Sequence, residues 1–157
     1  MTLASWALTI LLAALLTAIT VSDLRQTRIP NLLNLALAST GLAWRLVQRP
    51  EPIEIARALA DSFLVLATFA VMSWLIWSLR RLRGARDAGL GMGDLKFLAA
   101  AAIWCGYTGT LLLYGLACLG LIIVSLMRRG GPSEHPFGPY LAAGFLTVHG
   151  LRVTGAL

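Results

Sequence analysis

Long, uninterrupted blocks of apolar residues alternate along the chain with short segments rich in polar residues and glycine. The blocks lack the two-residue alternation of barrel strands, and a helix needs about 20 apolar residues to cross a bilayer. Backbone groups in lipid must pair within their own segment, which favours helices. The pattern therefore predicts an all-α, polytopic membrane protein, a bundle of about six transmembrane helices. The predicted spans are residues 3–22, 31–47, 55–79, 94–108, 110–127 and 136–154.

The composition supports this prediction, because 58% of the 157 residues are hydrophobic and only 13% are charged. The spans use most of the chain, so we expect a single integral-membrane domain over residues 1–157. The first apolar block has neither a basic segment before it nor a small-residue cleavage site after it. We therefore expect a transmembrane helix there and not a signal peptide.

Basic residues are distributed unevenly over the predicted loops, and the net charge is +6. If alternate loops face alternate sides, one side receives nine basic residues and the other receives four. The first set is Arg25, Arg28, Arg80, Arg81, Arg83, Arg86, Lys96, Arg128 and Arg129, and the second is Arg45, Arg49, Arg57 and Arg152. The positive-inside rule makes the first set cytoplasmic and both termini external. The arginine run after the third span favours contact with anionic headgroups over nucleic acid.

Two carboxyl groups are expected to meet at the cytoplasmic face. Asp23 ends the first span and Asp94 begins the fourth, so the alternation of spans places both on one side. An ionisable residue at membrane depth is costly and is a candidate for function. Two like charges close together share a proton, so one carboxyl group can activate water while the other protonates a leaving amide. This chemistry is that of an aspartic peptidase, which uses no metal and no cofactor.

Small residues surround the second aspartate. Gly91 and Gly93 precede Asp94, and glycine permits positive φ or a close approach of backbone or substrate. The run Ala99–Ala102 is expected to let neighbouring helices approach closely. The candidate site thus consists of Asp23 and Asp94 as the catalytic pair, with Gly91 and Gly93 in support.

Other functions are less well supported by the residues. The glycines at 89, 91 and 93 lack the preceding strand and the spacing of a dinucleotide-binding loop, and no HExxH zinc motif occurs. A proton- or ion-coupled transport subunit is the main alternative, and it would use Asp61 as a third acid in a relay. An inactive assembly scaffold is another. Side chains expected to be structural are Asp61, His135, His149, Cys105 and Cys118.

Three motifs together resemble the type IV prepilin peptidases. They are Asp23-Leu24-Arg25 with Ile29-Pro30-Asn31, then Gly91-Met92-Gly93-Asp94-Leu95-Lys96, and finally the segment from Pro136 to Gly144. The resemblance implies catalysis by Asp23 and Asp94, and a structural role near the site for Pro136 to Pro139. It also implies that Gly91 and Gly93 shape the active-site backbone and that Lys96 tunes the local charge.

It also implies an enzyme of the bacterial inner membrane that removes the basic leader from prepilin or pseudopilin substrates at the cytoplasmic face. The paired CxxC motifs of the longer members are absent from this sequence. The resemblance is therefore to the compact form of tight-adherence pilus systems, for which methyltransferase activity is not expected. The presenilin-type relatives carry YD and PAL motifs that this sequence also lacks.

Overall fold

The computed structural model describes residues 2–82, 91–127 and 136–156, and every regular element in these ranges is an α-helix. The elements are α1 (Leu3–Gln26), α2 (Asn31–Gln48), α3 (Pro52–Leu82), α4 (Met92–Met127) and α5 (Gly138–Val153). The predicted all-α class is confirmed. The predicted basic residues Arg83, Arg86, Arg128 and Arg129, together with His135, lie outside the described residues.

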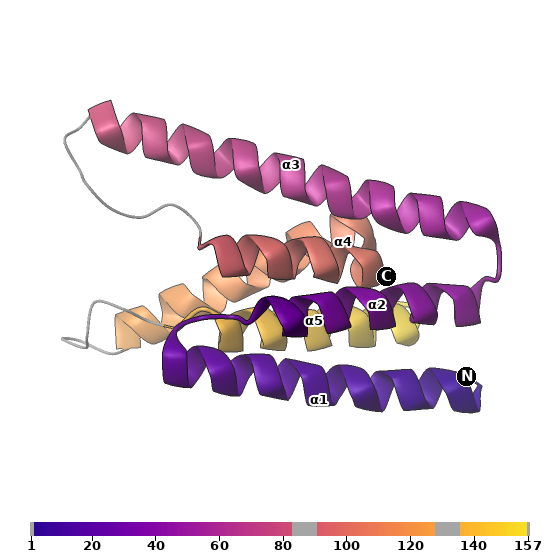
Figure 1. Cartoon of the computed structure of the whole chain (residues 1–157). Helices are drawn as coiled ribbons and strands as arrows, with labels where there is room; N and C mark the ends of the chain where they lie inside the picture. Colours follow the sequence, from indigo (N-terminus) through magenta and orange to yellow (C-terminus); the bar gives the residue numbers. More distant parts are fainter. Residues whose placement is uncertain (1, 83–90, 128–135, 157) are drawn as a thin grey trace.

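The predicted count of six helices is not confirmed, because the fourth and fifth predicted spans form one element, α4. Only Gly106 is non-helical within it, with φ 66° and ψ 175°, whereas two separate helices over residues 94–108 and 110–127 were expected. Positive φ is costly for residues with a Cβ, so glycine permits the break at this position. The chain reverses direction there, and both ends of α4 lie at the same end of the molecule (Figure 1).

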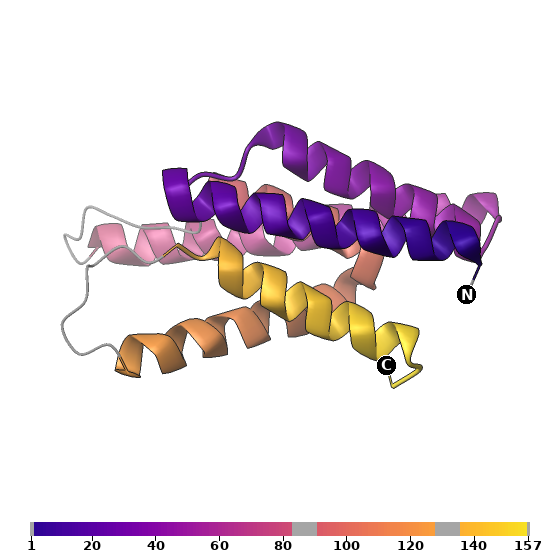
Figure 2. The same cartoon turned by 90° about the horizontal axis from the view of Figure 1, so that it is seen from below.

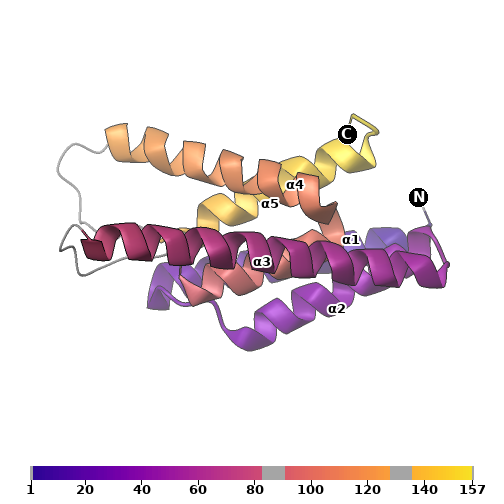
Figure 3. The ribbon, with the colours of Figure 1, turned by 90° about the horizontal axis from the view of Figure 1, so that it is seen from above.

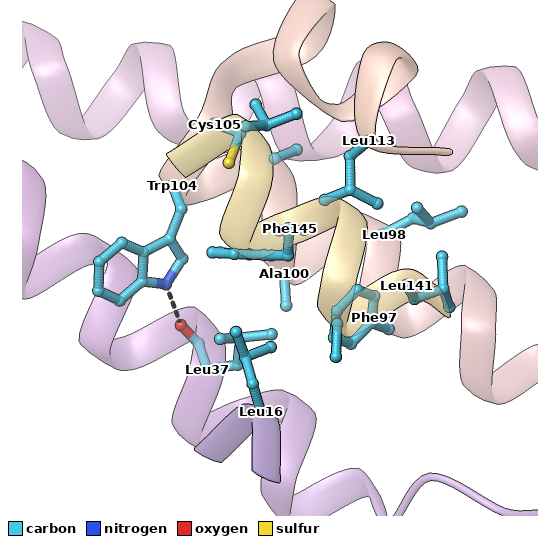
Figure 4. Packing of buried hydrophobic residues seen from close by; sticks show 14 of the residues in the cluster. Leu16, Leu37, Phe97, Leu98, Ala100, Trp104, Cys105, Leu113, Leu141 and Phe145 are labelled. Atoms are coloured by element: carbon cyan, nitrogen blue, oxygen red, sulfur yellow. Dashed lines mark hydrogen bonds between the residues drawn. The ribbon is translucent and has the colours of Figure 1, made fainter. Parts of the chain in front are cut away.

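α4 occupies the centre of the bundle and packs against α2, α3 and α5, while α1 packs against α2 and α5. Its first half carries the buried part of the alanine run, and Ala101 and Ala102 are fully buried. Trp104 donates its indole N–H to the backbone oxygen of Leu37 in α2 at 2.8 Å (Figure 4). Phe145 of α5 lies against the Trp104 ring, with centroids 6.2 Å apart. These contacts hold α2 and α5 against the first half of α4.

The outer faces of the helices carry large apolar side chains, as expected for helices that contact lipid. Trp6, Phe63 and Trp74 are each more than half exposed. α1, α4 and residues 52–79 of α3 are long and apolar enough to cross a membrane. At the end of α3 the Arg81 guanidinium lies 5.3 Å from the ring centroid of Trp77, a pairing suited to the interface between hydrocarbon and water. The chain is a membrane protein.

The ends of the helices divide the molecule into two poles. The α1–α2 connection and the starts of α4 and α5 lie at one pole (Figures 1 and 2). The α2–α3 connection, the break in α4 and the two chain ends lie towards the other, as Figure 3 also shows. Asp23 and Asp94 are therefore both carried to the first pole.

Candidate active site

Asp23 lies in the last turn and a half of α1, and the connection to α2 is held close to it. Thr27 ends the helix in a left-handed conformation, and its N–H donates to the backbone oxygen of Asp23 at 2.9 Å. The hydroxyl of Ser22 donates to the backbone oxygen of Arg28 at 3.1 Å. Ile29 then turns inward and is only 6% exposed. The Asp23 side chain is thus buried beside a connection that these two hydrogen bonds hold in place.

Asp94 lies in the first turn of α4 and is partly buried. The turn begins at Gly91, whose backbone oxygen accepts a hydrogen bond from Leu95 N–H at 3.1 Å. Lys96 donates from Nζ to Oδ1 of Asn31, the first residue of α2, at 2.9 Å. This hydrogen bond ties the start of α4 to the start of α2, so Lys96 has a structural contact in addition to its charge.

Asp23 and Asp94 line one open pocket of about 1020 Å³. Gly91, Gly93 and Lys96 line it too, so all five predicted site residues come together. Its wall consists of residues from the α1–α2 connection, the start of α4 and the segment before α5. Two carboxyl groups in such an arrangement can bind a water molecule and exchange its protons with a bound amide.

The expected reason for the two glycines is partly wrong. Neither Gly91 nor Gly93 has positive φ, which among the described glycines is found only at Gly106 and Gly155. Close approach is the better explanation for Gly91, because a Cβ there would lie 3.0 Å from Oδ2 of Asp94. At Gly93 a Cβ would make only ordinary contacts, the nearest at 3.5 Å from Cβ of Ile29.

Sequence reasoning missed the most direct polar contact of the site. The backbone N–H of Gly138, the first residue of α5, donates to Oδ2 of Asp23 at 2.7 Å. Pro136 and Phe137 also line the pocket. The sequence feature that could have indicated this contact was the segment Pro136-Phe137-Gly138-Pro139 at a helix start. This segment was expected to have a structural role near the site, but no contact with Asp23 was predicted.

Asp61 and His149 lie at the opposite pole. Asp61 accepts a hydrogen bond from Nη2 of Arg45 at 3.1 Å and does not line the pocket of Asp23 and Asp94. His149 is buried, with its ring centroid 5.1 Å from that of Trp44 and 5.4 Å from that of Trp104. Within the parts of the chain that the structure describes, no three His, Cys, Asp or Glu side chains are arranged to hold a metal ion.

The sequence was compared with known proteins. The model of the type IV leader peptidase family matches residues 10–126, a region that contains Asp23 and Asp94. The chain is 35% identical over 146 residues to the leader peptidase HopD of Escherichia coli, a match that covers 88% of this chain and 89% of that protein.

Two longer relatives are prepilin leader peptidase/N-methyltransferases. That of Aeromonas salmonicida is 34% identical over 146 residues, which cover 88% of this chain and 47% of the relative. That of Xanthomonas campestris pv. campestris is 36% identical over 138 residues, which cover 85% of this chain and 46% of the relative. The chain thus spans about half the length of these two relatives. No solved structure gives a significant match. The extent of the family match and the similarity to HopD along most of both chains show that this protein belongs to the type IV leader peptidase family.

Proposed function

We propose that this protein is a membrane-embedded aspartic endopeptidase that cleaves the leader peptide from prepilin or pseudopilin substrates, for pilus or secretion-system assembly. The observation that carries the proposal is that Asp23 and Asp94, from helices distant in sequence, line one pocket. Membership of a leader peptidase family supports the same reaction. The names of relatives such as prepilin leader peptidase/N-methyltransferase support prepilin-type substrates.

In the proposed reaction the two aspartates share one proton. The ionised carboxyl group takes a proton from water, and the resulting hydroxide attacks the carbonyl carbon of the scissile peptide bond. The protonated carboxyl group then donates its proton to the amide nitrogen as the carbon–nitrogen bond breaks, which yields a new carboxyl end and a new amino end. Sharing is favoured because two like charges in a partly buried pocket repel each other.

The supporting residues have distinct proposed roles. Gly91 and Gly93 leave the backbone before Asp94 free of side chains, so an extended peptide can approach it closely. Lys96 holds the start of α4 against Asn31 and also contributes positive charge to the pocket.

We place the site at the cytoplasmic face of the bacterial inner membrane. The pocket lies at the pole where α1 ends, directly after an apolar helix of 24 residues. The loops assigned to this pole by the sequence carry nine of the 13 basic residues, and such loops face the cytoplasm. A peptidase there would meet the leader before the substrate is exported.

The transport alternative receives less support. A relay requires acids placed in succession through the bilayer. Asp61 instead pairs with Arg45 and lies beside the break in α4 at Gly106, away from the pocket. We therefore retain the peptidase as the proposed function.

The direct test is co-expression with small pilin-like proteins encoded by neighbouring genes, followed by mass measurement of the pilin. The expected result is loss of a short basic leader in the presence of the wild-type enzyme and an intact precursor with Asp23→Asn or Asp94→Asn. An uncleaved precursor with every candidate in the presence of inserted wild-type enzyme would contradict the proposal. Leader loss with either aspartate variant would contradict the site assignment.

A further inference from the structure

The first residue of α5 touches Asp23 with both its N–H and its α-carbon. Gly138 is buried, and its N–H donates to Oδ2 of Asp23 at 2.7 Å. A Cβ placed on Gly138 would lie 2.8 Å from Cβ and 2.8 Å from Oδ2 of Asp23, and 3.0 Å from its Cγ. These separations are shorter than real Cβ contacts, and the Asp23 Cβ is fixed to the backbone of α1. Any side chain at position 138 must therefore displace Asp23 or α5.

The residues around Gly138 leave its N–H available for this contact. Pro139 has no N–H, and the N–H groups of Tyr140 and Leu141 both donate to the backbone oxygen of Phe137 at 3.1 Å. The Phe137 ring packs edge-on against Tyr114 of α4, with centroids 6.0 Å apart. The start of α5 is thus anchored against α4 while one N–H faces Asp23.

Asp23 needs such a partner more than Asp94 does. It lies near the C-terminus of α1, where the helix dipole disfavours a negative charge. The N-terminus of α5 has the opposite polarity and presents an N–H directly to the carboxyl group. Asp94 lies in the first turn of its own helix, which already favours a negative charge.

We propose that Gly138 is a positioning residue for Asp23: its N–H fixes the orientation of the Asp23 carboxyl group in the pocket, and its missing side chain permits the approach of α5. The inference rests on the proposed peptidase function and deepens it.

Within the described residues, the charged surroundings of Asp23 come from α1, the α1–α2 connection and α4. Arg28, Asp94 and Lys96 line the same pocket, and Arg25 follows on the same helix. Pro136 and Phe137, the described residues of the segment before α5 that line the pocket, carry no titratable side chain. Replacing the N–H of Gly138 therefore changes the stabilisation of Asp23 without removing any charged group from the pocket.

Two changes at position 138 separate the two parts of the proposal. Gly138→Ala keeps the N–H and adds the Cβ that collides with Asp23. Glycolic acid at position 138, introduced by cell-free translation into nanodiscs, replaces the N–H with an ester oxygen and keeps the shape of glycine. The matched controls are Gly150→Ala and glycolic acid at position 150, because Gly150 is in the same helix with no atom within 4 Å of an added Cβ.

Leader cleavage is then measured as kcat and KM. Both changes at position 138 are expected to lower kcat about ten- to hundredfold with little change in KM. The alanine displaces the Asp23 carboxyl group, and the ester removes the hydrogen bond to it. The changes at position 150 should leave both constants unchanged.

A wild-type kcat with the ester would overturn the inference, and so would a rise in KM alone. If Gly138→Ala fails to fold, the ester alone decides. Failure of this inference is distinguishable from failure of the proposed function by Asp23→Asn. When that variant is inactive and the ester is fully active, the peptidase stands and the role of Gly138 falls.

Discussion

Substitutions of Gly93 should have effects graded by size. A Cβ at this position would lie 3.5 Å from Cβ and 3.6 Å from the backbone nitrogen of Ile29, both ordinary contacts. Gly93→Ala should therefore cleave substrate at close to the wild-type rate. Gly93→Val adds two methyl groups that reach further towards Ile29, which is buried. Overpacking of this kind typically costs about 1–3 kcal/mol, and we expect a shift of the start of α4 to relieve it.

A shift at the start of α4 moves Asp94, the next residue. A displacement near 1 Å in a catalytic group can cost about a hundredfold in rate, so Gly93→Val should be nearly inactive while still inserted and folded. The assay is the initial rate of leader cleavage in nanodiscs, alongside thermal unfolding of each variant. Gly115→Ala and Gly115→Val, in the same helix with open space around the added atoms, are the matched controls. Equal loss with Gly93→Ala and Gly93→Val, or full activity of Gly93→Val, would refute the contact with Ile29 as the cause.

Three further predictions concern the rest of the molecule. Asp61→Asn should cleave substrate almost normally but lower the unfolding temperature, because Arg45 loses a charged partner worth roughly 1–3 kcal/mol; a strong loss of cleavage would place Asp61 in the mechanism. Gly106→Ala should destabilise the protein by about 1 kcal/mol or more, since φ is 66° there, and an unchanged unfolding temperature would contradict this. In a background without the native cysteines, Thr27→Cys should resist an impermeant external thiol reagent and Glu51→Cys should react. The opposite labelling would place the pocket outside.

The position of the site was predictable because it depends on properties that are local in sequence. Apolar block lengths define where helices can cross the membrane, and counting the crossings places Asp23 and Asp94 at one pole. The number of helices was not predictable, because it depends on how many residues around Gly106 leave the helical conformation. The residues after Gly106 are already helical, so two spans appear as one bent helix. Sequence patterns do not reveal that one residue suffices for the reversal.

The contact made by Gly138 was not predictable in the same way. It joins two residues separated by 115 positions, and it depends on how closely α5 approaches α1. A glycine between Phe137 and Pro139 indicates a helix start, but the partner of its N–H follows only from the packing. The same limitation applied to Gly91 and Gly93. The sequence allowed either positive φ or close approach at these two glycines, and neither of them has positive φ in the structure.

The most direct test of the central claim is a double-mutant comparison of leader cleavage by purified enzyme in nanodiscs, under single-turnover conditions. Asp23→Asn and Asp94→Asn should each lower the rate by about 10² to 10⁴ or more, while insertion and unfolding temperature stay near those of the wild type. If the two carboxyl groups act as one unit, the double variant should be no slower than the slower single variant. Independent, multiplying losses, or cleavage within tenfold of the wild type by either single variant, would contradict the shared catalytic pair.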